Sequence, residues 1–88
     1  MHETSKKTVL IVEDNDKNMK LARDILEAKG YAVLAATCGE DGVKLATEHL
    51  PDLVLMDIQM PGIDGVEALG LLRAEPRTAA VPVIAFTA

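Results

Sequence analysis

Val9-Leu10-Ile11-Val12-Glu13-Asp14-Asn15 is the stretch that decides the fold of this chain. Its first four residues form a continuous apolar run rich in β-branched side chains, which is typical of a strand buried on both faces of a parallel sheet. Further apolar runs lie at residues 31–36, 53–56 and 81–86. Patterns typical of helices separate these runs, at 17–29, from about 38 to 50 and from 64 to about 75. The resulting order β-α-β-α-β-α-β predicts an α/β fold, a parallel sheet with helices on both faces.

Local signals mark where the helices begin and end. We expect the first helix to end at Gly30, and the second to begin near Cys38, because Thr37 and Glu40 have the spacing of a capping box. Pro51 prevents that helix from continuing. The side chains expected to face the core from the second helix are Val43, Ala46 and Leu50, and the third helix carries the apolar residues Val66, Leu69, Leu71 and Leu72. Residues 1–7 are expected to form a disordered tail before a single domain at 8–88.

The composition excludes several classes of protein. A hydrophobic share of 49% in 88 residues rules out intrinsic disorder. Fourteen acidic against nine basic residues give a net charge of −5, which makes nucleic acid an improbable direct ligand. The single cysteine, Cys38, excludes a disulfide within the chain and a cysteine-based zinc site. No apolar run approaches a membrane span or a signal peptide, so we expect a cytoplasmic protein with no membrane partner.

Polar side chains follow three of the four predicted strands. Glu13 and Asp14 follow the first strand, Asp57 the third and Thr87 the fourth. Ligands of open α/β sheets bind beyond the carboxyl ends of the strands, so these groups converge if the first and third strands are neighbours. Three carboxylates repel one another unless a cation neutralises them, and an all-oxygen ligand set favours Mg²⁺. Asp57 could then attack phosphorus, while Thr87 is placed to bind a phosphoryl oxygen.

Each of these residues also has an ordinary structural interpretation. An acidic residue after a strand is often only a helix cap or a loop residue, as Glu13, Asp14 and Asp57 would be if taken singly. Thr87 taken alone is more often a residue that ends a strand. It is the combination, at strand ends that the fold brings to one place, that favours a site.

Residues 9–15, 51–65 and 82–88 together resemble the receiver domain of two-component response regulators, and the match runs from about Thr8 to the end of the chain. The resemblance implies a flavodoxin-like (CheY-like) fold in which Asp57 accepts a phosphoryl group. It implies that Glu13 and Asp14 hold Mg²⁺, Asp14 directly and Glu13 largely through water, with the backbone carbonyl of Gln59 completing the metal site. It also implies that Thr87 is the switch hydroxyl.

The resemblance further implies a partner, a histidine kinase or a histidine phosphotransfer protein that carries phosphohistidine. The chain departs from the family pattern because it lacks the last strand and the last helices, and with them the family's lysine, to which no residue here corresponds. We therefore expect a C-terminally truncated receiver domain with impaired phosphorylation. Its last strand then becomes an open edge, which invites self-association.

Two other functions compete with a phosphorylated signalling module. An aspartyl-phosphate phosphatase also uses an Asp after a strand, but it needs a second Asp two residues later, where this chain has Gln59. A non-phosphorylated, self-associating scaffold is the other alternative. A receiver domain catalyses only its own phosphorylation, so we do not expect a turnover enzyme.

Overall fold

The computed structural model describes residues 6–58, 60 and 65–86. Strands and helices alternate along the chain, as the sequence predicts. The strands are β1 (Thr8–Val12), β2 (Ala32–Ala36), β3 (Leu53–Asp57) and β4 (Val83–Phe86). The helices are α1 (Asp16–Ala28), α2 (Gly39–His49) and α3 (Gly65–Ala74). The described part of the chain contains no helix that is long and apolar enough to cross a bilayer.

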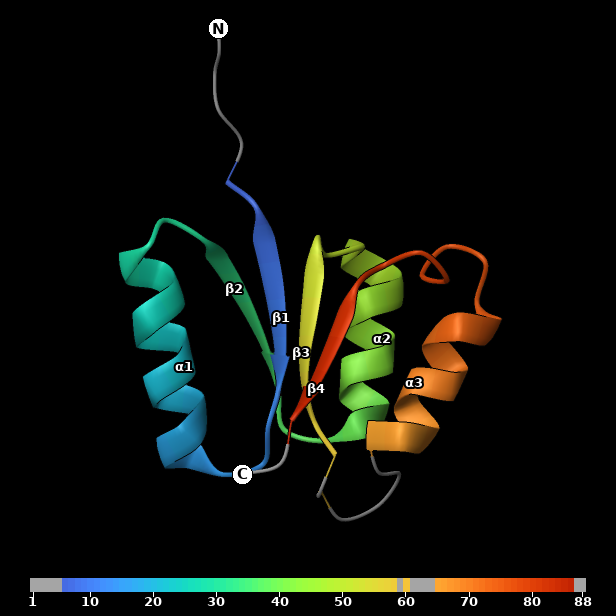
Figure 1. Ribbon diagram of the computed structural model, residues 1–88, viewed down its shortest axis with the longest axis horizontal. Coiled ribbons are helices and arrows are strands. Elements are labelled where there is room, and N and C mark those ends of the chain that lie inside the picture. Colours follow the sequence, from blue (N-terminus) through green and yellow to red (C-terminus); the bar gives the residue numbers. More distant parts are fainter. Residues whose placement is uncertain (1–5, 59, 61–64, 87–88) are drawn as a thin grey trace, which may run out of the picture.

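The four strands form one parallel sheet in the order β2-β1-β3-β4. Helix α1 covers one face of the sheet, and α2 with α3 covers the other, so the molecule has three layers (Figure 1). This arrangement confirms the predicted α/β fold with helices on both faces. All the strands end on the same side of the molecule, which is where the sequence places its polar residues.

The main apolar core lies between the sheet and helices α2 and α3. It contains the alternate strand residues that face these helices, together with small and branched side chains of the helices: Leu10, Val12, Ala36, Ala46, Val54, Met56, Met60, Ala68 and Leu72. Val9 and Ile11 point to the opposite face, and they are equally buried where α1 packs on β1 and β2. Strand β1 is therefore buried on both faces, as its unbroken apolar run predicts.

Helix α2 approaches β1 very closely at Gly42. A methyl group built on Gly42 would lie 2.7 Å from Cγ2 and 3.1 Å from Cγ1 of the buried Val12. Only a residue without a side chain fits at this crossing. The contact holds α2 against the last residue of β1, immediately before Glu13.

The connection from α3 to β4 is held by side chains that bond to its backbone. Pro76 has no N–H to offer the carbonyl of Leu72, and the buried hydroxyl of Thr78 donates to that carbonyl instead, at 2.6 Å. Arg73 Nη1 donates to the carbonyls of Ala79 at 2.9 Å and Val81 at 2.7 Å. These bonds hold the chain as it turns from the helix toward β4.

The structure corrects several local predictions. Cys38, not Thr37, is the N-cap residue of α2, and its side chain makes no capping hydrogen bond, so the predicted capping box does not form. Leu50 is not a core residue, because it takes a left-handed conformation at the end of α2 and is exposed. Val66 and Leu71 are also exposed, and Ala68 and Leu72 occupy the inner face of α3.

The predicted tail lies mostly outside the described residues. Lys6 and Lys7 are exposed, and the carbonyl of Lys7 accepts a hydrogen bond of 2.9 Å from the N–H of Ala32. Gly30 follows α1 with a φ of +94°, a conformation that glycine adopts without strain, as expected for a residue that ends a helix.

Candidate functional site

The pairing of β1 with β3 brings three carboxylates together. Val12 lies beside Met56 in the sheet register, so the next residue of each strand, Glu13 and Asp57, emerges at the same end. Asp14 follows in the loop that leads to α1. Carboxylate oxygens of Glu13, Asp14 and Asp57 all lie within 4.8 Å of one another. The convergence expected from the sequence is thus present in the fold.

The three carboxylates differ in their environments. Glu13 is 1% exposed and Asp57 is 2% exposed, whereas Asp14 is open to solvent. The N–H of Glu13 donates to the carbonyl of Ala36 at 3.0 Å, which extends the contact between β1 and β2 by one residue and holds the Glu13 backbone. Two buried carboxylates therefore lie side by side, with the third at the opening.

Asn15 links this cluster to helix α1. Its backbone N–H donates to Oε2 of Glu13 at 3.1 Å. Its side-chain Oδ1 accepts a hydrogen bond from the N–H of Asn18 at 3.0 Å and so caps the helix. The same residue thus begins α1 and orients the Glu13 carboxylate.

The other oxygen of Glu13, Oε1, is buried and meets no hydrogen-bond donor among the described residues. Burial raises the pKa of the Glu13 carboxyl above its ordinary value, and the N–H of Asn15 partly opposes this rise. The neighbouring Asp57 and Asp14 carboxyls raise the pKa of Glu13 further. An ionised Glu13 is therefore unfavourable in this cluster when no cation is close by.

The donor set fits a small hard cation. All three side chains offer oxygen, which is the ligand atom that Mg²⁺ prefers, and Mg²⁺ needs only one or two protein carboxylates because it retains water. A cation beside Glu13 Oε1 would satisfy a buried oxygen that otherwise has no partner in the described structure. Its positive charge would also relieve the repulsion among the carboxylates.

Other residues predicted for the site lie outside the described residues. These are Gln59, whose carbonyl was expected to complete the metal site, and Thr87, the expected switch hydroxyl. The contact from Asn15 to Glu13 was not predicted from the sequence. The residue type gives no sign of this contact because a backbone N–H makes it.

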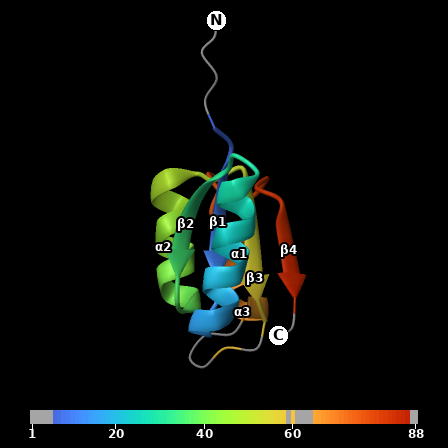
Figure 2. The ribbon, with the colours of Figure 1, turned by 90° about the vertical axis from the view of Figure 1, so that its left-hand side faces the viewer.

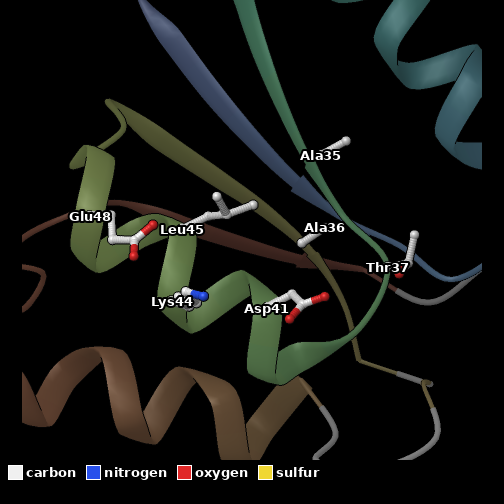
Figure 3. Close-up of a pocket in the computed structure, with 7 residues that line it drawn as sticks. All are labelled: Ala35, Ala36, Thr37, Asp41, Lys44, Leu45 and Glu48. Atoms are coloured by element: carbon white, nitrogen blue, oxygen red, sulfur yellow. The ribbon is translucent and has the colours of Figure 1, made fainter.

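A separate hollow of about 320 Å³ lies between β2 and α2, and none of the three clustered carboxylates lines it (Figure 3). Its charged lining residues, Asp41, Lys44 and Glu48, come from α2. These charged side chains therefore lie beside β2, the outer strand at this end of the sheet.

The carboxylate cluster beyond β1 and β3 lies in a chain whose sequence matches a known protein family. A model of the response regulator receiver domain matches residues 9–88. This chain is a response regulator receiver domain. The resemblance seen in the sequence is thereby confirmed, and with it the assignment to two-component signalling.

Individual relatives support this assignment. The receiver domain is 49% identical over 82 residues to the polar-differentiation response regulator DivK of Brucella ovis, a match that spans 93% of this chain and 67% of the relative. It superimposes with a TM-score of 0.91, at 34% identity, on the receiver domain of a sensor histidine kinase from Pseudomonas aeruginosa PAO1, covering 96% of this chain and 69% of the other. That structure has a magnesium ion coordinated in its active-site cleft.

A third similar protein is the receiver domain of the hybrid histidine kinase CckA, with a TM-score of 0.80 and 38% identity. The alignment covers 89% of this chain and 72% of that one. The chain therefore spans about two thirds of the length of the relatives that it matches.

Proposed function

We propose that this receiver domain accepts a phosphoryl group on Asp57 in a Mg²⁺-dependent reaction. The donor is a phosphohistidine of a histidine kinase or a histidine phosphotransfer protein. The observation that carries the proposal is the cluster of Glu13, Asp14 and Asp57, in which one buried Glu13 oxygen meets no donor among the described residues. Membership of the receiver family and the magnesium ion in the Pseudomonas aeruginosa relative support it.

The reaction is a substitution at phosphorus. A carboxylate oxygen of Asp57 forms the new P–O bond while the P–N bond to the donor imidazole breaks. The imidazole leaves with the electron pair of that bond and takes up a proton. The product is an aspartyl phosphate on the chain itself, so we propose a phosphoryl acceptor that catalyses its own phosphorylation, not a turnover enzyme.

The residues of the chain position the reacting group and balance charge. Asp57 ends a strand that is paired on both sides, so its backbone is held in place before the donor arrives. Asn15 orients Glu13, while the exposed Asp14 lies at the opening of the cluster. Mg²⁺ held by Glu13, Asp14 and Asp57, together with the carbonyl of Gln59, would neutralise the negative charge of the carboxylates and the incoming phosphoryl group. We propose Thr87 as the hydroxyl that binds a phosphoryl oxygen.

A phosphotransfer assay tests the proposal. We expect label from a phosphohistidine donor to move to the chain in the presence of Mg²⁺, and chelation by EDTA to prevent the transfer. Asp57→Asn should abolish the labelling. Asp41→Asn is the matched control, because it removes an exposed carboxylate on α2 outside the cluster and should leave the labelling unchanged. Labelling of Asp57→Asn at the parent level would refute the assignment.

A titration with Mg²⁺ tests the metal site separately from the reaction. We expect Mg²⁺ to shift the amide resonances of Asp14 and Asp57, with little effect on those of Lys44 in the separate hollow. If no residue of the cluster responded at millimolar Mg²⁺, the proposed metal site would be rejected.

The alternative to phosphoryl acceptance is a non-phosphorylated scaffold that assembles with itself. The observation that favours it is the position of the apolar strand β4 at one end of the sheet formed by the described residues. The two functions are compatible, because β4 and the carboxylate cluster use different atoms.

A further inference from the structure

Asn15 belongs both to the carboxylate cluster and to helix α1. Its backbone N–H donates to Oε2 of Glu13 at 3.1 Å. Its side-chain Oδ1 accepts from the N–H of Asn18 at 3.0 Å, and this bond caps α1. Figure 2 shows the first turn of α1 at the end of the molecule where β1 and β3 also end. The start of this helix and the cluster are thus joined through one residue.

The extended backbone of Asn15 serves both hydrogen bonds. Its φ of −91° and ψ of 120° are typical of an N-cap residue, whose carbonyl already accepts the first helical bond. In this structure that bond comes from the N–H of Met19, at 2.9 Å. Because the side chain and the carbonyl are both held by the first turn, the peptide N–H of Asn15 keeps its direction toward Glu13. Loss of the side-chain bond would release one of these two restraints.

The bond from Asn15 also determines which oxygen of Glu13 is available to a cation. Oε2 accepts from the Asn15 N–H, whereas Oε1 is buried and has no donor within residues 6–58, 60 and 65–86. A carboxylate held through one oxygen has less rotational freedom to lose when its other oxygen binds a ligand. Hydrogen bonds that orient metal ligands in this way typically change metal affinity by about 10–100-fold.

We propose that Asn15 is a positioning residue of the Mg²⁺ site, and that its side-chain cap couples occupancy of the carboxylate cluster to the first turn of α1. Asn15 acts through Glu13 and does not itself bind the cation. By thermodynamic linkage the coupling is reciprocal, so bound Mg²⁺ stabilises the cap by the same free energy that the cap contributes to Mg²⁺ binding. The inference rests on the proposed Mg²⁺ site, and it adds to that site a residue whose side chain is bonded to the helix.

Two substitutions at Asn15 separate the cap from the rest of the site. A ¹H–¹⁵N NMR titration with MgCl₂, followed at the amides of Asp14 and Asp57, measures the Kd of the parent and of each variant. Asn15→Ala removes the acceptor for the Asn18 N–H but keeps its own N–H, so the Kd should rise by about 10-fold, the lower end of the range for such hydrogen bonds. Asn15→Ser retains a capping oxygen and should restore the Kd to within about twofold of the parent value.

Ala22→Gly is the matched control for a general loss of helix stability. Ala22 lies in the interior of α1, and glycine there weakens a helix about as much as the loss of an N-cap does. Neither Ala22→Gly nor Asn15→Ala changes the charge of the chain. Ala22→Gly should lower the Tm as Asn15→Ala does, and it should leave the Kd for Mg²⁺ unchanged. An equal rise in Kd in both variants would assign the effect to helix stability and would overturn the positioning role.

Hydrogen exchange tests the reciprocal effect without any reaction at Asp57. Saturating Mg²⁺ should slow exchange of the Asn18 N–H in the parent, by the same factor that separates the Kd of Asn15→Ala from that of the parent. In Asn15→Ala this N–H has lost its acceptor, so Mg²⁺ should not slow its exchange. The same exchange rate of the Asn18 N–H in the parent with and without Mg²⁺ would refute the coupling.

The outcomes distinguish this inference from the proposed function. If the parent chain bound no Mg²⁺, the metal-dependent function and this inference would both fail. If the parent bound Mg²⁺ and accepted the phosphoryl label on Asp57, but Asn15→Ala had the same Kd as the parent, only the positioning role of Asn15 would be wrong.

Discussion

The close approach of α2 to β1 leads to a quantitative prediction for Gly42→Ala. The added methyl group would lie 2.7 Å from the nearest carbon of Val12, well inside ordinary van der Waals contact. Val12 is fully buried, and its β-branched side chain has little freedom to turn away. Overpacking of this kind costs about 1–3 kcal/mol.

Gly70→Ala is the control that isolates this cost. Gly70 is also inside a helix, α3, but a methyl group there would meet nothing within 4 Å. Both substitutions gain about 1 kcal/mol of helix propensity, so this gain cancels when the two variants are compared. Gly70→Ala should therefore stabilise the fold by about 1 kcal/mol, and Gly42→Ala should be less stable than Gly70→Ala by about 1–3 kcal/mol.

Urea unfolding followed by circular dichroism measures both free energies. In thermal unfolding, a difference of 1 kcal/mol corresponds to a Tm difference of about 4–8 °C for a domain of this size. Because Val12 precedes Glu13, Gly42→Ala should also weaken Mg²⁺ binding, whereas Gly70→Ala should not. Equal stability of the two variants would show that Val12 yields without cost, and would refute the close-packing argument.

Two further predictions concern buried polar groups. The pKa of Glu13 is raised in the fold, so the stability that its protonated form contributes is fully present below about pH 4.5 and is lost as the pH rises through the raised value. Without Mg²⁺, Glu13→Gln should thus have a higher free energy of unfolding than the parent at pH 7, and this difference should shrink toward pH 4. Urea titrations that gave the same difference in free energy at both pH values would contradict this prediction. Thr78→Val leaves the carbonyl of Leu72 without its donor and should lower the free energy of unfolding by about 1–3 kcal/mol. Thr78→Ser keeps the hydroxyl and should lose less, and a thermal melt in which Ser loses as much as Val would rule out the hydrogen bond as the cause.

The fold class and the position of the carboxylate cluster could be predicted from the sequence. Apolar runs separated by helical patterns define a parallel sheet, and the strands of such a sheet end on one side. The sequence therefore predicts that one site contains Glu13, Asp14 and Asp57. The sequence also predicts that helices end at Gly30 and before Pro51, because the backbone constraints of glycine and proline act locally.

The tertiary structure alone decided how the elements contact one another. Periodicity marks apolar positions on a helix but not which of them meets the sheet: of the apolar residues on α3, Val66 and Leu71 are exposed, whereas Leu72 is buried. The burial of Glu13 and the exposure of Asp14 likewise depend on the packing around the end of β1. The need for glycine at position 42 depends on Val12, thirty residues away along the chain. Sequence patterns report local geometry, whereas burial and close contact arise only when distant segments meet.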